Sequence, residues 1–147
     1  MMRTFRRILV FPFLKLGFMN VNESVIFGDP KRIRLGKNMH LYNAILNTNS
    51  GFIFIEDDVS ILPNSILVTG THDFSKKGLE RRKTYPRTGM NIVIKKGAWI
   101  GSGVIVLGNV TIGENSVVGA GSVVTRNVEA NCIAVGNPAK TIRKLQF

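Results

Sequence analysis

Few residues in this chain could carry out acid–base chemistry. Among its 147 residues there are two histidines and one cysteine. His72 stands between the apolar stretch ILVTGT and the polar stretch DFSKKG, where a regular pattern stops. An imidazole gains or loses a proton near neutral pH, which suits general acid–base catalysis. On its own a histidine here would more often cap a loop, and His40, within GKNMHLY, is expected to be a surface residue.

The histidine and cysteine counts also exclude some kinds of site. Cys132 has no partner for an internal disulfide, so an oxidising compartment is not required and a cytoplasmic location is expected. A zinc site with three histidine ligands needs more imidazoles than the chain has. We therefore expect no metal centre.

A six-residue repeat dominates the second half of the chain. Aliphatic residues recur at Ile94, Ile100, Val106, Ile112, Val118 and Val124. Four places after each stands a second small or aliphatic residue: Ala98, Val104, Val110, Ser116, Ser122 and Val128. A helix would repeat about every 3.6 residues and a strand every 2, so a period of six indicates a solenoid. Three hexads, each a short strand and a turn, would close one coil of a parallel β-helix.

The repeat continues upstream with interruptions. Its inward positions there are predicted to be Leu35, Leu41 and Asn47, and then Ile55, Ile61 and Leu67. We predict about five coils stacked about 4.8 Å apart in one all-β domain over residues 21–147. The one long interruption, residues 73–91, is expected to protrude as a loop, and residues 137–147 to form a C-terminal tail.

The positive charge lies outside this repetitive body. The net charge is +11, of which residues 1–20 contribute +4, residues 73–87 contribute +4 and residues 140–144 contribute +3. The remaining basic and acidic residues balance. A DNA-binding surface would more often be a stripe on the body, so no nucleic-acid partner is expected. Basic loops and a basic end fit phosphate-bearing small molecules better.

The sequence ILVTGTHDFS, followed by a loop and then by GAWIGSG and VGNPAK, resembles the hexapeptide-repeat acetyltransferases, in particular the maltose, galactoside, nodulation-type and polysaccharide O-acetyltransferases. The resemblance covers roughly residues 21–144. It implies a left-handed β-helix, acetyl-CoA as cosubstrate, and a homotrimer with active sites between subunits. A non-catalytic scaffold is the alternative from another functional class.

The resemblance assigns roles to individual residues. His72 matches the general base that deprotonates a sugar hydroxyl, and the backbone N–H of Ser102 matches the donor to the thioester oxygen. Residues that match coenzyme A contacts are Trp99, Ser102, Ala120, Lys140 and Arg143, with Lys144 and Arg126 as weaker candidates. The alternatives are corner packing for Trp99, turn geometry for residues 119–121 and a solvated basic tail for Lys140 and Arg143.

The acceptor is the least specified part of the prediction. Relatives hold it with an asparagine thirty residues before the histidine, and gapless counting reaches Tyr42, with Asn43 beside it. In the loop, Arg81, Arg82 and Arg87 would suit a nucleotide-linked, lipid-linked or acidic acceptor, or the loop is simply solvated. We expect O-acetylation of a saccharide in surface-polysaccharide or glycoconjugate synthesis; N-acetylation of an amino sugar is the nearest alternative.

Residues 1–20 combine arginines with Phe, Leu and Ile. Pro12 and Lys15 interrupt the apolar run, and no small-residue cleavage site follows it, so neither a signal peptide nor a membrane span is expected. The segment could contact the inner face of the membrane peripherally. It could instead cap the open first coil, which a solenoid requires.

Overall fold

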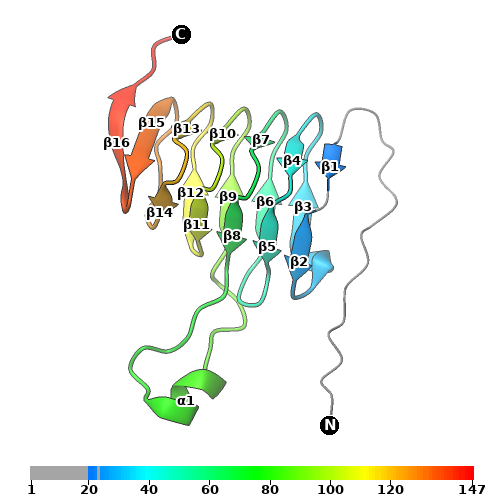
Figure 1. Ribbon diagram of the computed structural model, residues 1–147, viewed down its shortest axis with the longest axis vertical. Coiled ribbons are helices and arrows are strands. Elements are labelled where there is room, and N and C mark those ends of the chain that lie inside the picture. The colour runs from blue at the N-terminus through cyan, green and yellow to red at the C-terminus, as the bar shows by residue number, and fades with distance from the viewer. Residues whose placement is uncertain (1–19, 23) are drawn as a thin grey trace.

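The computed structural model describes residues 20–22 and 24–147, so the expected roles of residues 1–19 lie outside the described residues. Three sheets form the fold (Figure 1). Sheet A contains the parallel strands β1 (Asn20–Asn22), β4 (His40–Tyr42), β7 (Ser60–Ile61), β10 (Trp99–Ile100), β13 (Val117–Val118) and β15 (Cys132–Gly136). Sheet B contains β2 (Val25–Phe27), β5 (Ile45–Asn47), β8 (Ile66–Val68), β11 (Ile105–Leu107) and β14 (Val123–Val124). Sheet C contains β3 (Ile33–Leu35), β6 (Ile53–Ile55), β9 (Ile92–Ile94) and β12 (Val110–Ile112).

The chain visits sheets A, B and C in turn, and each strand pairs in parallel with the strand one coil away. The fifth coil closes through the parallel bridge between Ile112 and Val128, and β15 then begins a sixth. The fold is the predicted left-handed parallel β-helix. Its only helical elements in the described residues are the 3-10 helix η1 (Pro30–Arg32) and α1 (Gly78–Lys83).

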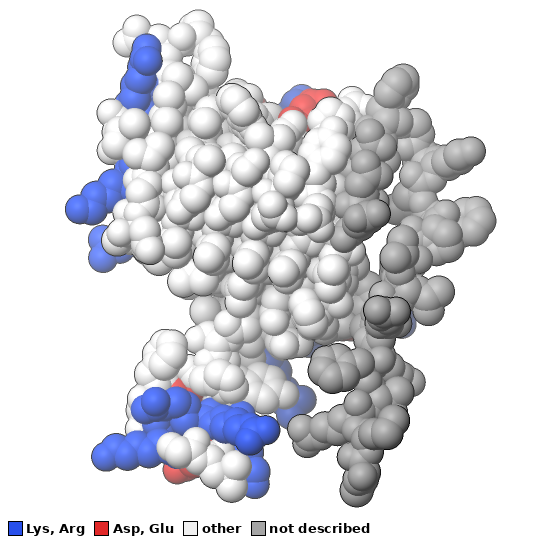
Figure 2. All heavy atoms as spheres, in the orientation of Figure 1, with Lys and Arg blue, Asp and Glu red and all other residues white. Residues whose placement is uncertain are grey.

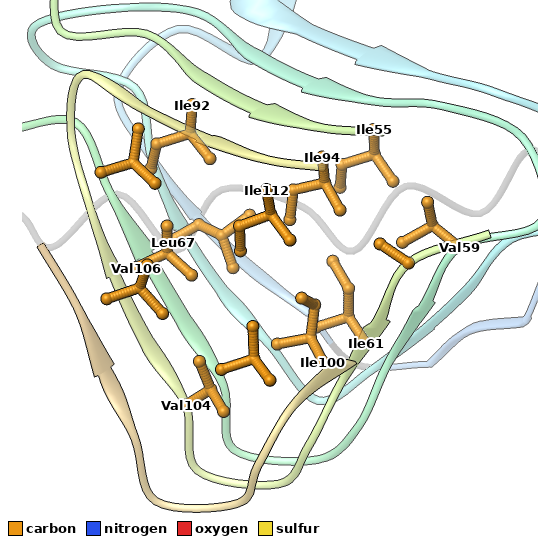
Figure 3. Close-up of a cluster of buried hydrophobic side chains, with 14 of the residues drawn as sticks. Ile55, Val59, Ile61, Leu67, Ile92, Ile94, Ile100, Val104, Val106 and Ile112 are labelled. Carbon is orange, nitrogen blue, oxygen red and sulfur yellow. The ribbon is translucent and has the colours of Figure 1, made fainter. Parts of the chain in front are cut away.

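The hexad positions fill the interior as predicted. All twelve predicted inward residues between Ile94 and Val128 are at most 5% exposed. Figure 3 shows the aliphatic side chains from successive coils meeting along the centre, with Ile61 beside Ile100 and Ile94 beside Ile112. The buried serines bond to nearby backbone; Ser116 Oγ, for example, donates to the carbonyl of Gly113 at 2.7 Å. Burial of these columns is the main source of stability in a solenoid.

One of the inward positions predicted for the first half of the chain is wrong. Asn47 was expected to point inward, but Leu46 is the buried residue and pairs in register with Leu67 of the next coil. The corner between β4 and β5 is one residue shorter than the corner between β7 and β8, so the pattern advances by five residues and not six. Because side chains alternate along a strand, this slip turns Asn47 outward.

The long interruption protrudes from the prism between β8 and β9, as predicted, and carries the short helix α1 near its tip (Figure 1). The C-terminal end differs from the predicted tail. Residues 139–144 form β16 (Ala139–Lys144), which pairs antiparallel with β15 and adds an edge strand to sheet A. In the described residues, no helix is long and apolar enough to cross a membrane.

Two of the three basic segments expected from the sequence lie within the described residues. Figure 2 shows lysine and arginine side chains gathered on the protruding loop around α1 and at the C-terminal end, with a largely uncharged prism face between them. On this face the loop and the C-terminal end carry most of the cations.

Candidate active site

His72 lies at the corner between sheets B and C, four residues after β8 ends and at the root of the protruding loop. Its Nδ1 atom is 3.1 Å from the carbonyl oxygen of Arg81 in α1. Since a carbonyl can only accept a hydrogen bond, this contact favours the tautomer with the proton on Nδ1. The Nε2 atom is then left with a lone pair that can accept a proton. The imidazole is exposed to solvent.

Tyr85 contacts this imidazole from the returning limb of the loop. The two rings meet edge to face, with centroids 6.1 Å apart and planes at 80°. The guanidinium of Arg87 lies 5.5 Å from the centre of the Tyr85 ring. The sequence analysis did not identify Tyr85; an aromatic residue within a basic loop was the available signal.

A cavity of about 400 Å³ opens beside His72. Its lining residues are uncharged: Asn47, Asn49, Ser50, Gly70, Thr71, His72 and Tyr85. Amide and hydroxyl groups that both donate and accept hydrogen bonds suit a ligand rich in hydroxyl groups. Ser50 is fully buried, and its Oγ has no hydrogen-bond partner among the described residues. Asn47 joins the cavity only because of the one-residue slip in the preceding corner.

Ser102 and Ala120 lie together at a different corner, between sheets A and B. They are stacked one coil apart, since the amide of Gly121 donates to the carbonyl of Ser102 at 2.9 Å. The coil before them has Pro63 at the same position, because the amide of Gly103 donates to its carbonyl at 3.0 Å. Because proline has no N–H, the hydrogen bonds between coils do not require a backbone amide donor at this position. In the described chain the amides of Ser102 and Ala120 likewise have no acceptor, and both are free to bind a ligand.

A row of outward side chains leads from this corner to the basic edge. Trp99 is 50% exposed on sheet A. It stands in register with Val117, which pairs with Ile133, which in turn pairs with Arg143 on β16. At the usual strand spacing Trp99 and Arg143 are roughly 14 Å apart. Lys140, Arg143 and Lys144 are all exposed on this edge strand, and Arg126 is exposed at the corner after β14.

Two of the predicted acceptor residues do not lie beside His72 within one chain. Tyr42 ends β4, and Asn43 follows it at the corner between sheets A and B, where its side-chain amide donates to Asn64 at 2.8 Å. This is the corner of Ser102, across the width of sheet B from His72. One chain therefore carries two separate groups of candidate residues.

The three loop arginines have different surroundings. Arg81 braces the loop itself, because its Nε donates to the carbonyl of Lys76 at 2.7 Å. Arg87 covers Tyr85, and Arg82 is exposed on α1. Hydrogen bonds from the hydroxyl and amide of Ser75 lower the pKa of Asp73, next to the histidine, so this carboxylate stays ionised and closes its turn.

A second hollow, of about 480 Å³, follows the outer face of sheet C and contains none of the predicted site residues. Glu56 lies in it and accepts a hydrogen bond from Lys95 at 2.7 Å, which lowers the pKa of the glutamate. Glu56 also accepts from the amide of Lys96 at 3.0 Å. These contacts join neighbouring coils.

Comparisons with known proteins show which family this fold belongs to. The family model for bacterial transferase hexapeptides, with six repeats, matches residues 91–126. The galactoside O-acetyltransferase of Lactococcus lactis is 34% identical over 90% of this chain and 66% of its own. A galactoside acetyltransferase solved in complex with coenzyme A superposes with a TM-score of 0.74 and 33% identity over 83% of this chain and 60% of that one.

A hexapeptide-repeat acetyltransferase from Vibrio cholerae superposes with a TM-score of 0.68 and 30% identity over 86% of this chain and 73% of that one. The chain spans between 56% and 66% of the length of the curated relatives that it matches. The stacked hexads and these similarities together place this chain in the family of hexapeptide-repeat acetyltransferases.

Proposed function

We propose that the protein transfers an acetyl group from acetyl-CoA to a hydroxyl group of a saccharide, with His72 as general base. The observation that carries this proposal is the orientation of His72, whose Nδ1 is held by the Arg81 carbonyl beside a cavity lined by uncharged polar groups. The similarity to galactoside O-acetyltransferases supports the choice of acceptor class.

The chemistry needs one proton acceptor and one donor to a developing negative charge. Acetyl-CoA supplies the thioester carbon, at which a new C–O bond forms and the C–S bond breaks. His72 takes the hydroxyl proton on Nε2 as the oxygen attacks, and returns it to the departing thiolate. The free amide of Ser102 donates to the carbonyl oxygen as charge develops there. No covalent intermediate with the protein is required.

The residues at the corner between sheets A and B fit coenzyme A. The free amide of Ala120 would donate to the pantetheine arm, and the exposed indole of Trp99 would pack along it. Lys140 and Arg143 on the edge strand would meet phosphate groups. The solved complex of a galactoside acetyltransferase with coenzyme A supports this cosubstrate.

A homotrimer would unite the two groups of residues. His72 and Ser102 lie at the two corners that border sheet B. If three prisms turn sheet B toward a threefold axis, one corner of each meets the other corner of its neighbour. The outer face of sheet B suits such contact, because Val25, Ile45, Ile66, Ile105 and Val123 form a continuous aliphatic row. Tyr42 and Asn43 of one subunit would then approach His72 of the next.

The acceptor would lie in the His72 cavity with its sugar ring near Tyr85. Arg82 and Arg87 would bind an anionic group at the rim, as in a nucleotide-linked, lipid-linked or acidic saccharide. Arg81 would stabilise the loop and would not bind the acceptor, because its Nε donates to the carbonyl of Lys76. This acceptor would fit surface-polysaccharide or glycoconjugate synthesis in the cytoplasm, with residues 1–20 available for peripheral contact with the membrane.

Thiol release from acetyl-CoA tests the proposed reaction. The purified protein is assayed with free sugars, nucleotide sugars, amino sugars and acidic oligosaccharides, and the product is treated with mild base. We expect acceptor-dependent release and a base-labile O-acetyl ester. A base-stable product would establish N-acetylation instead, and failure to bind acetyl-CoA would favour a scaffold.

Neutralising the basic edge is expected to weaken the binding of coenzyme A specifically. The double variant Lys140→Gln with Arg143→Gln should raise KM for acetyl-CoA roughly tenfold, since hydrogen bonds to charged groups are lost. The same change should have little effect on KM for the dephospho form, which lacks the 3′-phosphate. Lys31→Gln, at the other end of the solenoid, is the control. Equal KM values for the double variant and Lys31→Gln would contradict the assignment.

A further inference from the structure

Arg32 reaches from the first coil to two other segments of the molecule. It ends η1, which begins with Pro30 and is capped by Asp29 through a 2.9 Å bond from the amide of Lys31. Its Nη1 atom donates to the carbonyl of Arg87 at 2.9 Å and to that of Thr48 at 3.2 Å, with a longer contact of 3.4 Å to Asn49. One half-buried guanidinium therefore joins η1, the rim of the His72 cavity and the returning limb of the protruding loop.

The bond to Arg87 attaches the returning limb of the loop to the solenoid. Inside the loop, the amide of Asp73 donates to Thr84 at 3.1 Å, and Arg81 holds the imidazole of His72. These bonds stay within residues 72–84. Apart from the contact of His72 with Arg81, the bond from Arg32 is the one hydrogen bond between residues 73–88 and the coils in the described part of the chain. The loop bonds to a coil again at Met90, whose amide donates to the carbonyl of Ser50 at 3.1 Å.

The position of Arg87 is transmitted to Tyr85 over a short, stiff path. Pro86 lies between them; its ring fixes its own φ and restricts the residue before it. Anchoring the carbonyl of Arg87 therefore restrains the backbone of Tyr85. The side chain of Arg87 also covers the Tyr85 ring, whose edge meets His72. Release of Arg87 would loosen Tyr85 directly, and α1 with it.

We propose that Arg32 is a positioning residue for His72, acting through the returning limb of the loop. It makes no contact with the imidazole, and its effect depends on the Arg81 carbonyl and the Tyr85 ring staying in place. The proposal rests on the proposed function for its catalytic consequence. Its structural part does not depend on any acceptor. That part consists of the hydrogen bond from Arg32 to the carbonyl of Arg87, here called the tether, and the tautomer of His72.

Arg34 provides a matched control. Its guanidinium lies 6.0 Å from the centre of the Phe52 ring, against 5.9 Å for that of Arg32. The hydrogen bonds of Arg34 go only to Lys31 and Ile33 in its own segment, as far as the described residues extend. Arg32→Met and Arg34→Met therefore remove the same charge near the same ring, and only the first removes the tether.

The ring nitrogens of His72 provide a readout that does not need activity. Long-range ¹H–¹⁵N spectra are readily assigned in a chain with two histidines, using His40→Gln. In the wild type and Arg34→Met we expect the neutral ring to carry its proton on Nδ1. In Arg32→Met we expect a mixture of tautomers, and cleavage by trypsin within residues 76–87 roughly tenfold faster.

The kinetic readout separates positioning from binding. Arg32→Met should lower kcat roughly tenfold while leaving KM for acetyl-CoA unchanged, because the coenzyme A residues lie at another corner. Arg32→Lys, which keeps a charged donor, should recover part of the loss. If Arg32→Met does not fold, Arg32→Lys is compared with Arg34→Lys by the same measurements.

The tether is overturned if the Arg32 variant matches its Arg34 control in tautomer and in trypsin cleavage. A changed tautomer and faster cleavage with unchanged kcat would overturn the positioning role. The same structural changes in a protein that releases no thiol with any acceptor would support the tether while removing the proposed function.

Discussion

Replacing His72 by alanine should lower kcat for O-acetyl transfer by roughly 10²-fold to 10⁴-fold, the usual range for loss of a general base. A sugar hydroxyl is a poor nucleophile at neutral pH, and Nε2 of His72 is the proton acceptor that the structure leaves available beside the cavity. The Kd for acetyl-CoA should stay close to that of the wild type, because its candidate contacts lie at a different corner. Thiol-release kinetics and calorimetric titration with coenzyme A measure the two quantities.

His40→Ala is the control for this change. His40 lies on sheet A, where it stacks on Tyr42 with ring centroids 5.7 Å apart. Its loss should leave kcat near the wild-type value. With an amine acceptor the effect of His72→Ala should be smaller, because a neutral amine attacks without a base. If His72→Ala keeps a kcat near the wild-type value on a hydroxyl acceptor, His72 is not the general base and serves only to cap its loop.

Placing a charge on the outer face of sheet B is expected to abolish activity without unfolding the chain. Ile66 stands in the middle of the aliphatic row, paired in register with Ile45 and Ile105. Lysine at this position would be solvated in a single prism but unpaired in a closed interface, where an unpaired charge is costly. Ile66→Lys should therefore give folded monomers whose kcat/KM falls roughly 10²-fold or more, because the two groups of site residues separate.

Sedimentation and thiol release test this expectation together. Val93→Lys is the control, because Val93 is an outward aliphatic residue at the middle of sheet C, between Phe54 and Thr111. It should remain a trimer with wild-type activity. A trimeric, active Ile66→Lys protein would place the interface on another face.

The interior of the fold was predictable because one requirement repeats in every coil. Aliphatic residues at every sixth position can all be buried only if successive coils place them at equivalent points. The six residues from Ile94 to Val124 at this spacing are all buried. The prediction failed where a corner has another length. The short corner at Asn43 moves Leu46 into the core and Asn47 to the surface, and no hexad count over residues 35–47 reveals that loss.

The candidate site was predictable only in part, for reasons of geometry. Ser102 and Ala120 were assigned through the family resemblance, and the repeat places them at the same corner, one coil apart. Tyr85 contacts His72, and Ser50 lines the same cavity, because of the path of the protruding loop and of a corner, neither of which follows the repeat. Tyr42 was found by counting along the chain, and counting does not show that sheet B separates its corner from that of His72. The same limit applies to β16, whose pairing depends on the reversal after β15.

Mixing two inactive variants tests most directly whether the site is shared between subunits. His72→Ala removes the proposed base, and Ala120→Trp, at an exposed corner position, puts a bulky side chain where the pantetheine arm is proposed to bind. If adjacent subunits contribute one group each, random trimers from an equal mixture should recover about a quarter of the wild-type rate of thiol release, since one site in four combines intact halves. A mixture that stays as inactive as its components would show that each chain works alone, and would contradict the account.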